Sequence, residues 1–117
     1  MLPRTKRPKI LEGWNYQIPT GCENLYVTIS GVGGNGASPM ELIASMGKSG
    51  GCTNCLNQAI GRVISIGLQW GVPISEYMGT LKGLQCDNPK AFPTEARCLS
   101  CPDGISIAIG NHLGDDK

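Results

Sequence analysis

Residues 40–70, MELIASMGKSGGCTNCLNQAIGRVISIGLQW, contain the change of periodicity that decides the fold. From Met40 to Met46 apolar residues alternate with polar ones, which predicts a β-strand. The glycine-rich segment 47–51 ends this pattern. Apolar residues then recur at steps of three and four through residue 70, which predicts a long amphipathic helix. The apolar positions of that helix are Cys52, Cys55, Leu56, Ala59, Ile60, Val63, Ile64 and Leu68.

Two further strands are expected before this stretch. Residues 10–18 place Trp14, Tyr16 and Ile18 on one face at a period of two, and residues 25–30 alternate in the same way. Consecutive strands tend to lie side by side, so the three strands favour an antiparallel meander. The predicted core between the sheet and the long helix consists of Trp14, Tyr16, Leu25, Val27, Ile29, Leu56, Ile60, Val63, Ile64 and Leu68.

Two shorter helices are expected after residue 70. Apolar residues at helical spacing over 74–81 predict one helix, which stops at Gly83. Residues 84–97 are expected to form a loop, because Pro89 and Pro93 break regular structure. Ser100 and Asp103 have the spacing of a helix cap, so a last helix should begin near Pro102. The predicted fold class is α+β, a three-stranded antiparallel sheet packed against helices.

Length and composition are those of one compact domain. The chain has 117 residues, 40% of them hydrophobic and 16% charged, with a net charge of +1. We expect a basic N-terminal arm over residues 1–9, either solvated or docked on an acidic partner, and a single domain over residues 10–113. The near-neutral charge argues against nucleic acid as a partner, and no apolar run is long enough for a membrane helix.

The six cysteines call for an explanation other than disulfides. The N-terminus has no secretory signal, so a cytoplasmic location is expected, and thiols there stay reduced. In such a compartment a cysteine set more often marks metal binding or redox chemistry. Cys52 and Cys55, like Cys98 and Cys101, are spaced so that both thiolates of a pair can reach one tetrahedral ion. Burial as small hydrophobic side chains is the competing interpretation.

Two glycine-rich segments resemble nucleotide-binding motifs without completing them. GVGGNG at residues 31–36 matches a dinucleotide fingerprint, but a strand rather than a helix is predicted to follow it. The triplet Gly47-Lys48-Ser49 lacks the first glycine of a P-loop. A small-anion or nucleotide site at Lys48, Ser49 and Gly50 stays open as an alternative, with Lys82 as a further cation.

Four motifs follow one another along the chain: Thr20-Gly21-Cys22, Gly47-Lys48-Ser49-Gly50-Gly51-Cys52 with Ala59-Ile60-Gly61-Arg62, Leu81-Lys82-Gly83-Leu84-Gln85-Cys86, and Leu99-Ser100-Cys101-Pro102-Asp103. With these motifs the sequence resembles the TSCPD domain family over residues 7–113. Domains of this family form the C-terminal end of the vitamin B12-dependent ribonucleotide reductases and also occur as small free-standing proteins. The resemblance implies cysteine ligands at Cys22, Cys52, Cys86 and Cys101. Here Leu99 replaces the signature threonine, Glu23 replaces a usual glycine, and Cys55 and Cys98 look like additions.

The resemblance implies a function related to deoxyribonucleotide synthesis. A chain this short has no room for a catalytic barrel, a radical site or a cobalamin domain, so we expect no ribonucleotide reduction by the chain alone. The leading hypothesis is a non-catalytic accessory module that holds zinc or an iron–sulfur cluster, with a ribonucleotide reductase or another protein as partner. The cysteine layout is also remotely similar to iron–sulfur cluster scaffolds. An iron–sulfur or sulfur-transfer scaffold and a small nucleotide-sequestering protein are therefore the alternatives, and a homo-oligomer stays open.

Overall fold

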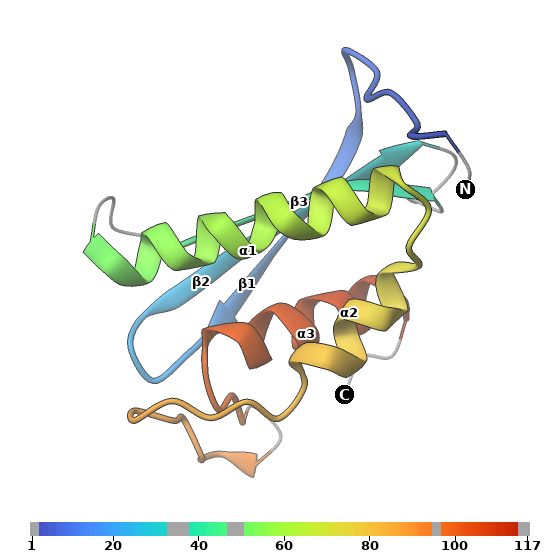
Figure 1. Cartoon of the computed structure of the whole chain (residues 1–117). Helices are drawn as coiled ribbons and strands as arrows, with labels where there is room; N and C mark the ends of the chain where they lie inside the picture. Colours follow the sequence, from blue (N-terminus) through green and yellow to red (C-terminus); the bar gives the residue numbers. More distant parts are fainter. Residues whose placement is uncertain (1–2, 33–37, 47–50, 95–96, 115–117) are drawn as a thin grey trace.

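The computed structural model describes residues 3–32, 38–46, 51–94 and 97–114, and it confirms the predicted α+β fold (Figure 1). Strands β1 (Glu12–Pro19), β2 (Asn24–Val32) and β3 (Ser38–Met46) form an antiparallel sheet in the order β1-β2-β3. Helices α1 (Gly51–Gln69), α2 (Ile74–Leu81) and α3 (Cys101–His112) follow. Each predicted element is present, with ends that differ by at most two residues from those expected.

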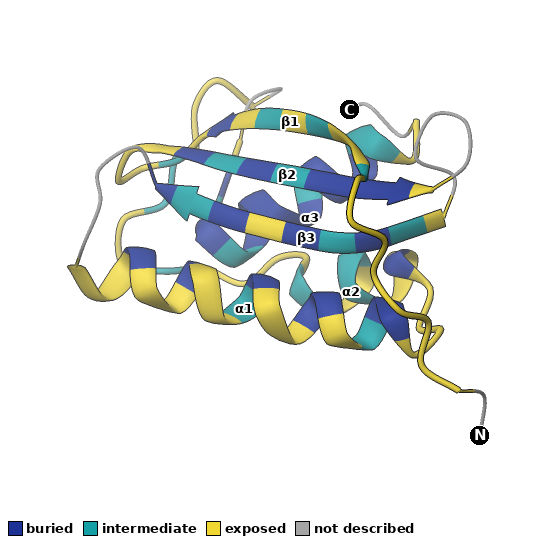
Figure 2. Ribbon diagram, turned by 90° about the horizontal axis from the view of Figure 1, so that it is seen from above, coloured by how far each residue is buried: buried dark blue, intermediate teal, exposed yellow. Residues whose placement is uncertain are grey.

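One face of the sheet supplies the centre of the core. Leu25, Val27 and Ile29 alternate along β2 and are fully buried, as their period of two predicts. Helix α3 packs against β1 and β2 and contributes Ile105 and Ile109, which are also fully buried. Helix α2 packs on α3, whereas α1 packs against β3 (Figure 2).

The prediction of which face of α1 is buried was wrong. Leu56 and Val63 were expected in the core but are 64% and 66% exposed, and Ile60 is only half-buried. Ile64 and Leu68 are buried as expected. The other buried positions of the helix are polar or small: Asn54, Asn57, Gly61, Ser65 and Gln69. Trp14 and Tyr16 were also placed in the core but are half-buried, beside His112 at the end of α3.

The reason is that α1 lies along the open edge of the sheet. β3 is an edge strand, and its outward backbone groups need hydrogen-bond partners. Ser65 Oγ accepts from Leu42 N at 2.9 Å, Asn54 Oδ1 accepts from Met46 N at 3.0 Å, and Gln69 Nε2 donates to the Met40 carbonyl at 3.3 Å. The polar face of α1 therefore supplies hydrogen-bond partners to the backbone of β3, whereas the apolar face of α1 was expected to cover the sheet.

A glycine makes this close approach possible. A Cβ atom on Gly61 would lie 2.8 Å from the Leu42 carbonyl oxygen and 3.3 Å from Ala44 N, so any larger residue would push the helix away from β3. The Gly61 carbonyl is itself 2.8 Å from Ser65 Oγ, which ties the two contacts together.

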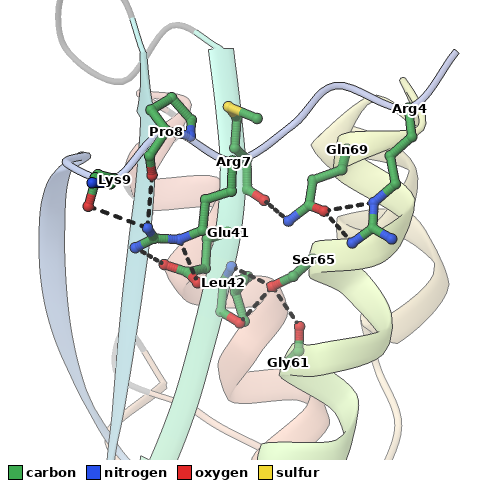
Figure 3. A network of polar contacts seen from close by, with 10 residues as sticks. Arg4, Arg7, Pro8, Lys9, Glu41, Leu42, Gly61, Ser65 and Gln69 are labelled. Atoms are coloured by element: carbon green, nitrogen blue, oxygen red, sulfur yellow. Dashed lines mark hydrogen bonds and ion pairs between the residues drawn. The ribbon is translucent and has the colours of Figure 1, made fainter.

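The basic N-terminal arm contacts the domain itself (Figure 3). Arg7 pairs with Glu41 of β3 at 3.1 Å, and Arg4 Nε donates to Gln69 Oε1 at 2.9 Å. Thr5 N also donates to the Gln69 carbonyl at 2.8 Å. The acidic group that Arg7 meets therefore belongs to the same chain, although an exposed pair of this kind contributes little stability.

Candidate functional site

Four of the cysteines come from segments that meet at one end of the molecule. Cys22 lies in the β1–β2 turn, Cys52 in the first turn of α1, Cys86 in the loop after α2, and Cys101 at the first position of α3. Figure 1 shows the β1–β2 turn, the starts of α1 and α3 and the loop after α2 at the same end. The three thiols of Cys22, Cys86 and Cys101 line one groove of about 670 Å³.

The first motif positions Cys22 through its threonine and its glycine. Thr20 Oγ1 accepts from the backbone N of Cys22 at 3.1 Å and donates to the Glu23 carbonyl at 2.6 Å, which fixes the turn. A Cβ on Gly21 would lie 1.8 Å from the Asn88 carbonyl oxygen. Only glycine therefore lets the loop that carries Cys86 approach the turn that carries Cys22.

Asn88 joins these two thiols. Its side-chain Nδ2 donates to the Gly21 carbonyl at 2.7 Å and lies 3.8 Å from Cys22 Sγ. Its backbone N lies 3.3 Å from Cys86 Sγ and donates to it. Thiolate is the form of cysteine that binds metals, and these N–H groups lie where a metal-bound thiolate would accept hydrogen bonds. Asn88 was not singled out from the sequence, where an Asn-Pro pair indicates only a turn.

The last motif positions Cys101 and holds the Cys86 loop. Ser100 caps α3 by accepting from Asp103 N at 3.1 Å, as predicted, and its hydroxyl donates to the Leu84 carbonyl at 2.6 Å. Asp103 accepts from the backbone N of Gly83 at 2.8 Å and of Leu99 at 3.0 Å. The serine and aspartate of the motif therefore tie the segment before Cys86 to the start of α3.

Burial dominates the electrostatics of the two inner thiols. It raises the pKa of Cys98 to about 11. The neutral Cys98 thiol donates a hydrogen bond to the Ser100 carbonyl at 3.2 Å. Burial also raises the pKa of Cys101, while the approach of the Asn57 side-chain donor lowers it and the nearby Cys22 and Cys86 raise it further. Cys101 lies at the start of a helix, whose dipole favours the thiolate form.

Asn57 is the second residue that sequence analysis missed. It lies on α1, lines the groove beside Cys101 and is only 2% exposed. Its Nδ2 forms no hydrogen bond of ordinary geometry within the described residues, although the amide lies close enough to Cys101 to lower the pKa of that thiol. A polar residue amid the apolar positions of a helix was the one signal available, and it does not distinguish a site from a structural contact.

The remaining predicted residues lie elsewhere or outside the described part. Cys52 and Cys55 are exposed on α1, and Cys98 is buried beside Cys101 and Cys86. In the described ranges, no three His, Cys, Asp or Glu side chains stand close enough together to hold one metal ion. Lys48, Ser49 and Gly50 lie outside the described residues.

The fold and the thiol-lined groove define a small cysteine-rich α+β domain. The model of the TSCPD domain family matches residues 3–113, nearly the whole chain, so the chain belongs to this family. Membership is consistent with a ribonucleotide reductase-related module. Searches of curated proteins and of solved structures gave no significant match. None of the helices in the described part is long and apolar enough to cross a membrane.

Proposed function

We propose that the chain is a non-catalytic accessory module of ribonucleotide reduction that binds a metal through Cys22, Cys52, Cys86 and Cys101. The observation that carries the proposal is the convergence of Cys22, Cys86 and Cys101, from three separate segments, on one groove. Each of these thiols is held there by a motif of the family. A ribonucleotide reductase is the partner that the family relation suggests.

The donor set fits a soft metal. Thiolates select zinc or an iron–sulfur cluster, and all six cysteines of the chain are free. Cys22 is exposed and lies in a turn, and Cys86 is half-buried in a loop. A metal shared with the buried Cys101 would require both thiols to shift toward it, since no three such side chains stand together in the described residues. Cys52, at the first turn of α1, completes the set that the family resemblance implies.

A bound metal would act on stability and on the positions of these segments. Zinc held by four thiolates would form a closed, structural site, whereas a cluster would supply a redox or sulfur-donating centre. The chain's own residues supply the thiolates and the N–H donors of Asn88 near Cys22 and Cys86. Metal binding in such a site contributes to folding stability and releases protons from the thiols.

Single substitutions of the cysteines test the proposal. The protein and its Cys→Ser variants are purified anaerobically, and zinc, iron and sulfide are measured per chain. We expect loss of metal in the variants of Cys22, Cys52, Cys86 and Cys101, with a lower unfolding temperature. Cys55→Ser is the matched control for Cys52→Ser, because both residues are exposed on the first turns of α1.

Two results would contradict the assignment. Loss at Cys55 and Cys98 with retention at Cys22 and Cys86 would move the site to the two local pairs. Cys98 is 1% exposed and can be needed for folding, so Cys98→Ala is measured beside Cys98→Ser with the unfolding temperature of each. A wild-type protein that folds fully and never contains metal, even when reconstituted with zinc or with iron and sulfide, would remove the site.

A further inference from the structure

The groove extends well beyond the thiols, along the apolar face of α1 that the sheet does not use. Leu56, Ile60 and Val63 form one wall, and Tyr77 and Leu81 of α2 line the opposite side. Leu56 and Val63 are 64% and 66% exposed although their spacing is that of core residues. A mostly apolar groove of about 670 Å³ is within the size range of small-molecule sites.

The two helices close this groove at the end away from the thiols. A Cβ on Gly67 of α1 would lie 1.7 Å from the Tyr77 hydroxyl, so Tyr77 stands directly against the backbone of α1 there. The groove is therefore bounded by Tyr77 at one end and by Cys22, Cys86 and Cys101 at the other. These boundaries limit the length of an occupant to that of a small molecule.

A single buried donor gives the groove its chemical preference. Asn57 lines the groove, is 2% exposed and has no hydrogen-bond partner for Nδ2 within the described residues. An unpaired buried donor is unfavourable, and it becomes favourable when a ligand supplies an acceptor. The amide carries two N–H groups, so it can serve a ligand and the neighbouring Cys101 sulfur together.

The charges of the lining residues narrow the range of possible ligands further. Among its described lining residues the groove has no Lys, Arg or His, and its one charged side chain is Asp87. Phosphate or carboxylate groups would find no cation in it. The interior backbone carbonyls of a partner helix are already hydrogen-bonded, so such a helix would have to offer Asn57 a side-chain or terminal acceptor.

We propose that the groove between α1 and α2 binds a small, uncharged, mainly apolar molecule whose carbonyl-type oxygen accepts a hydrogen bond from Asn57. This site is separate from metal binding, although it ends at the same thiols. The bound molecule would cover Leu56 and Val63, which explains why residues with core spacing stand exposed along one side of α1.

A fluorescence titration with prodan, an uncharged naphthyl ketone dye, tests this site. Val63→Glu places a charge in the groove and should weaken dye binding by at least about tenfold, because burying an unpaired charge is unfavourable. Ile66→Glu is the matched control, since Ile66 is 50% exposed on the same helix but does not line the groove. The control should bind the dye as wild type does.

The donor is tested by Asn57→Leu and, in case that variant fails to fold, by Asn57→Ala. Loss of one neutral hydrogen bond should weaken dye binding by about two- to tenfold. The dye emission should also shift to shorter wavelength, because the ketone loses its hydrogen bond. Cys52→Ser, which lies outside the groove, should keep dye binding even if it loses metal, so the two proposals fail separately.

Four results would overturn the proposed site. The first two are a wild-type protein that shows no saturable dye binding, and an equal loss of dye affinity in Val63→Glu and Ile66→Glu. The others are unchanged dye affinity and emission in the Asn57 variants, and a wild-type dimer that Val63→Glu dissociates in the absence of dye. The last result, from sedimentation, would assign the groove to a second copy of the chain.

Discussion

Replacing Ser65 by alanine should destabilise the domain more than replacing the larger Val63. The Ser65 hydroxyl accepts from Leu42 N at 2.9 Å and donates to the carbonyl of Leu42 at 3.1 Å or of Gly61 at 2.8 Å. Leu42 is 1% exposed and Ser65 9%, so water replaces the lost partner only poorly. An orphaned buried N–H costs about 1–3 kcal/mol, and the better helix propensity of alanine returns about 0.5 kcal/mol. The free energy of unfolding should therefore fall by about 0.5–2.5 kcal/mol.

Val63→Ala is the control on the same helix. Val63 is 66% exposed, so its methyl groups are mostly in water already and the change should stay within about 0.5 kcal/mol. Urea unfolding followed by circular dichroism measures both variants, and an unchanged denaturant dependence shows that the unfolded states are comparable. If Val63→Ala costs more than Ser65→Ala, the apolar side of α1 faces the sheet and the edge-strand argument fails.

Three other predictions concern Gly61, Asp103 and Cys98. Gly61→Ala should cost about 1–3 kcal/mol, because its Cβ would meet backbone atoms of β3, whereas Gly79→Ala, with open space around the position, should cost nothing; equal unfolding midpoints would refute this. Asp103→Ala should cost about 1–3 kcal/mol, because it orphans two backbone N–H groups, and it should lower metal retention; a variant with wild-type stability and metal content would contradict both. The free energy of unfolding should fall as pH rises from about 9 to about 11. In the unfolded chain Cys98 ionises near its ordinary pKa of 9.0, whereas burial raises its pKa in the folded state to about 11. Cys98→Ala should flatten this dependence of stability on pH, and an identical dependence in the variant would argue against the prediction.

The strands and helices could be predicted because local patterns specify them. Alternation along β2 and the cap formed by Ser100 and Asp103 are properties of neighbouring residues, and both are present as expected. The order of strands followed from short connections between them. These are features in which the local sequence and the global fold agree.

The buried face of α1 could not be predicted, because it depends on a partner far away in sequence. Periodicity identifies an apolar side of a helix and assumes that this side faces the core. Whether a helix covers the face of a sheet or lies along its edge depends on where the chain places it. At the edge, Ser65 and Asn54 meet backbone groups, and the polar side becomes the buried one.

The candidate site was predicted only in part. The family resemblance identified Cys22, Cys86 and Cys101 as candidate site residues. The contacts of Thr20, Gly21 and Asp103 explain why the motifs contain these residues beside the cysteines. The ligand set itself stays a prediction. The sequence signals of Asn57 and Asn88 were too general to indicate a site, because an asparagine contributes to a site through its three-dimensional surroundings.

The position of α1 connects the fold to both proposals. A bare edge strand promotes association with other chains, and covering it with a helix is one way in which proteins prevent this. Here the cover uses polar side chains, so the apolar residues Leu56, Ile60 and Val63 are left for the opposite side. Because α3 covers β1 and β2 and α2 packs on α3, that side of α1 faces α2 across a groove. The groove ends where the family motifs bring the thiols together. The covered sheet edge and the apolar groove thus both follow from one placement of α1.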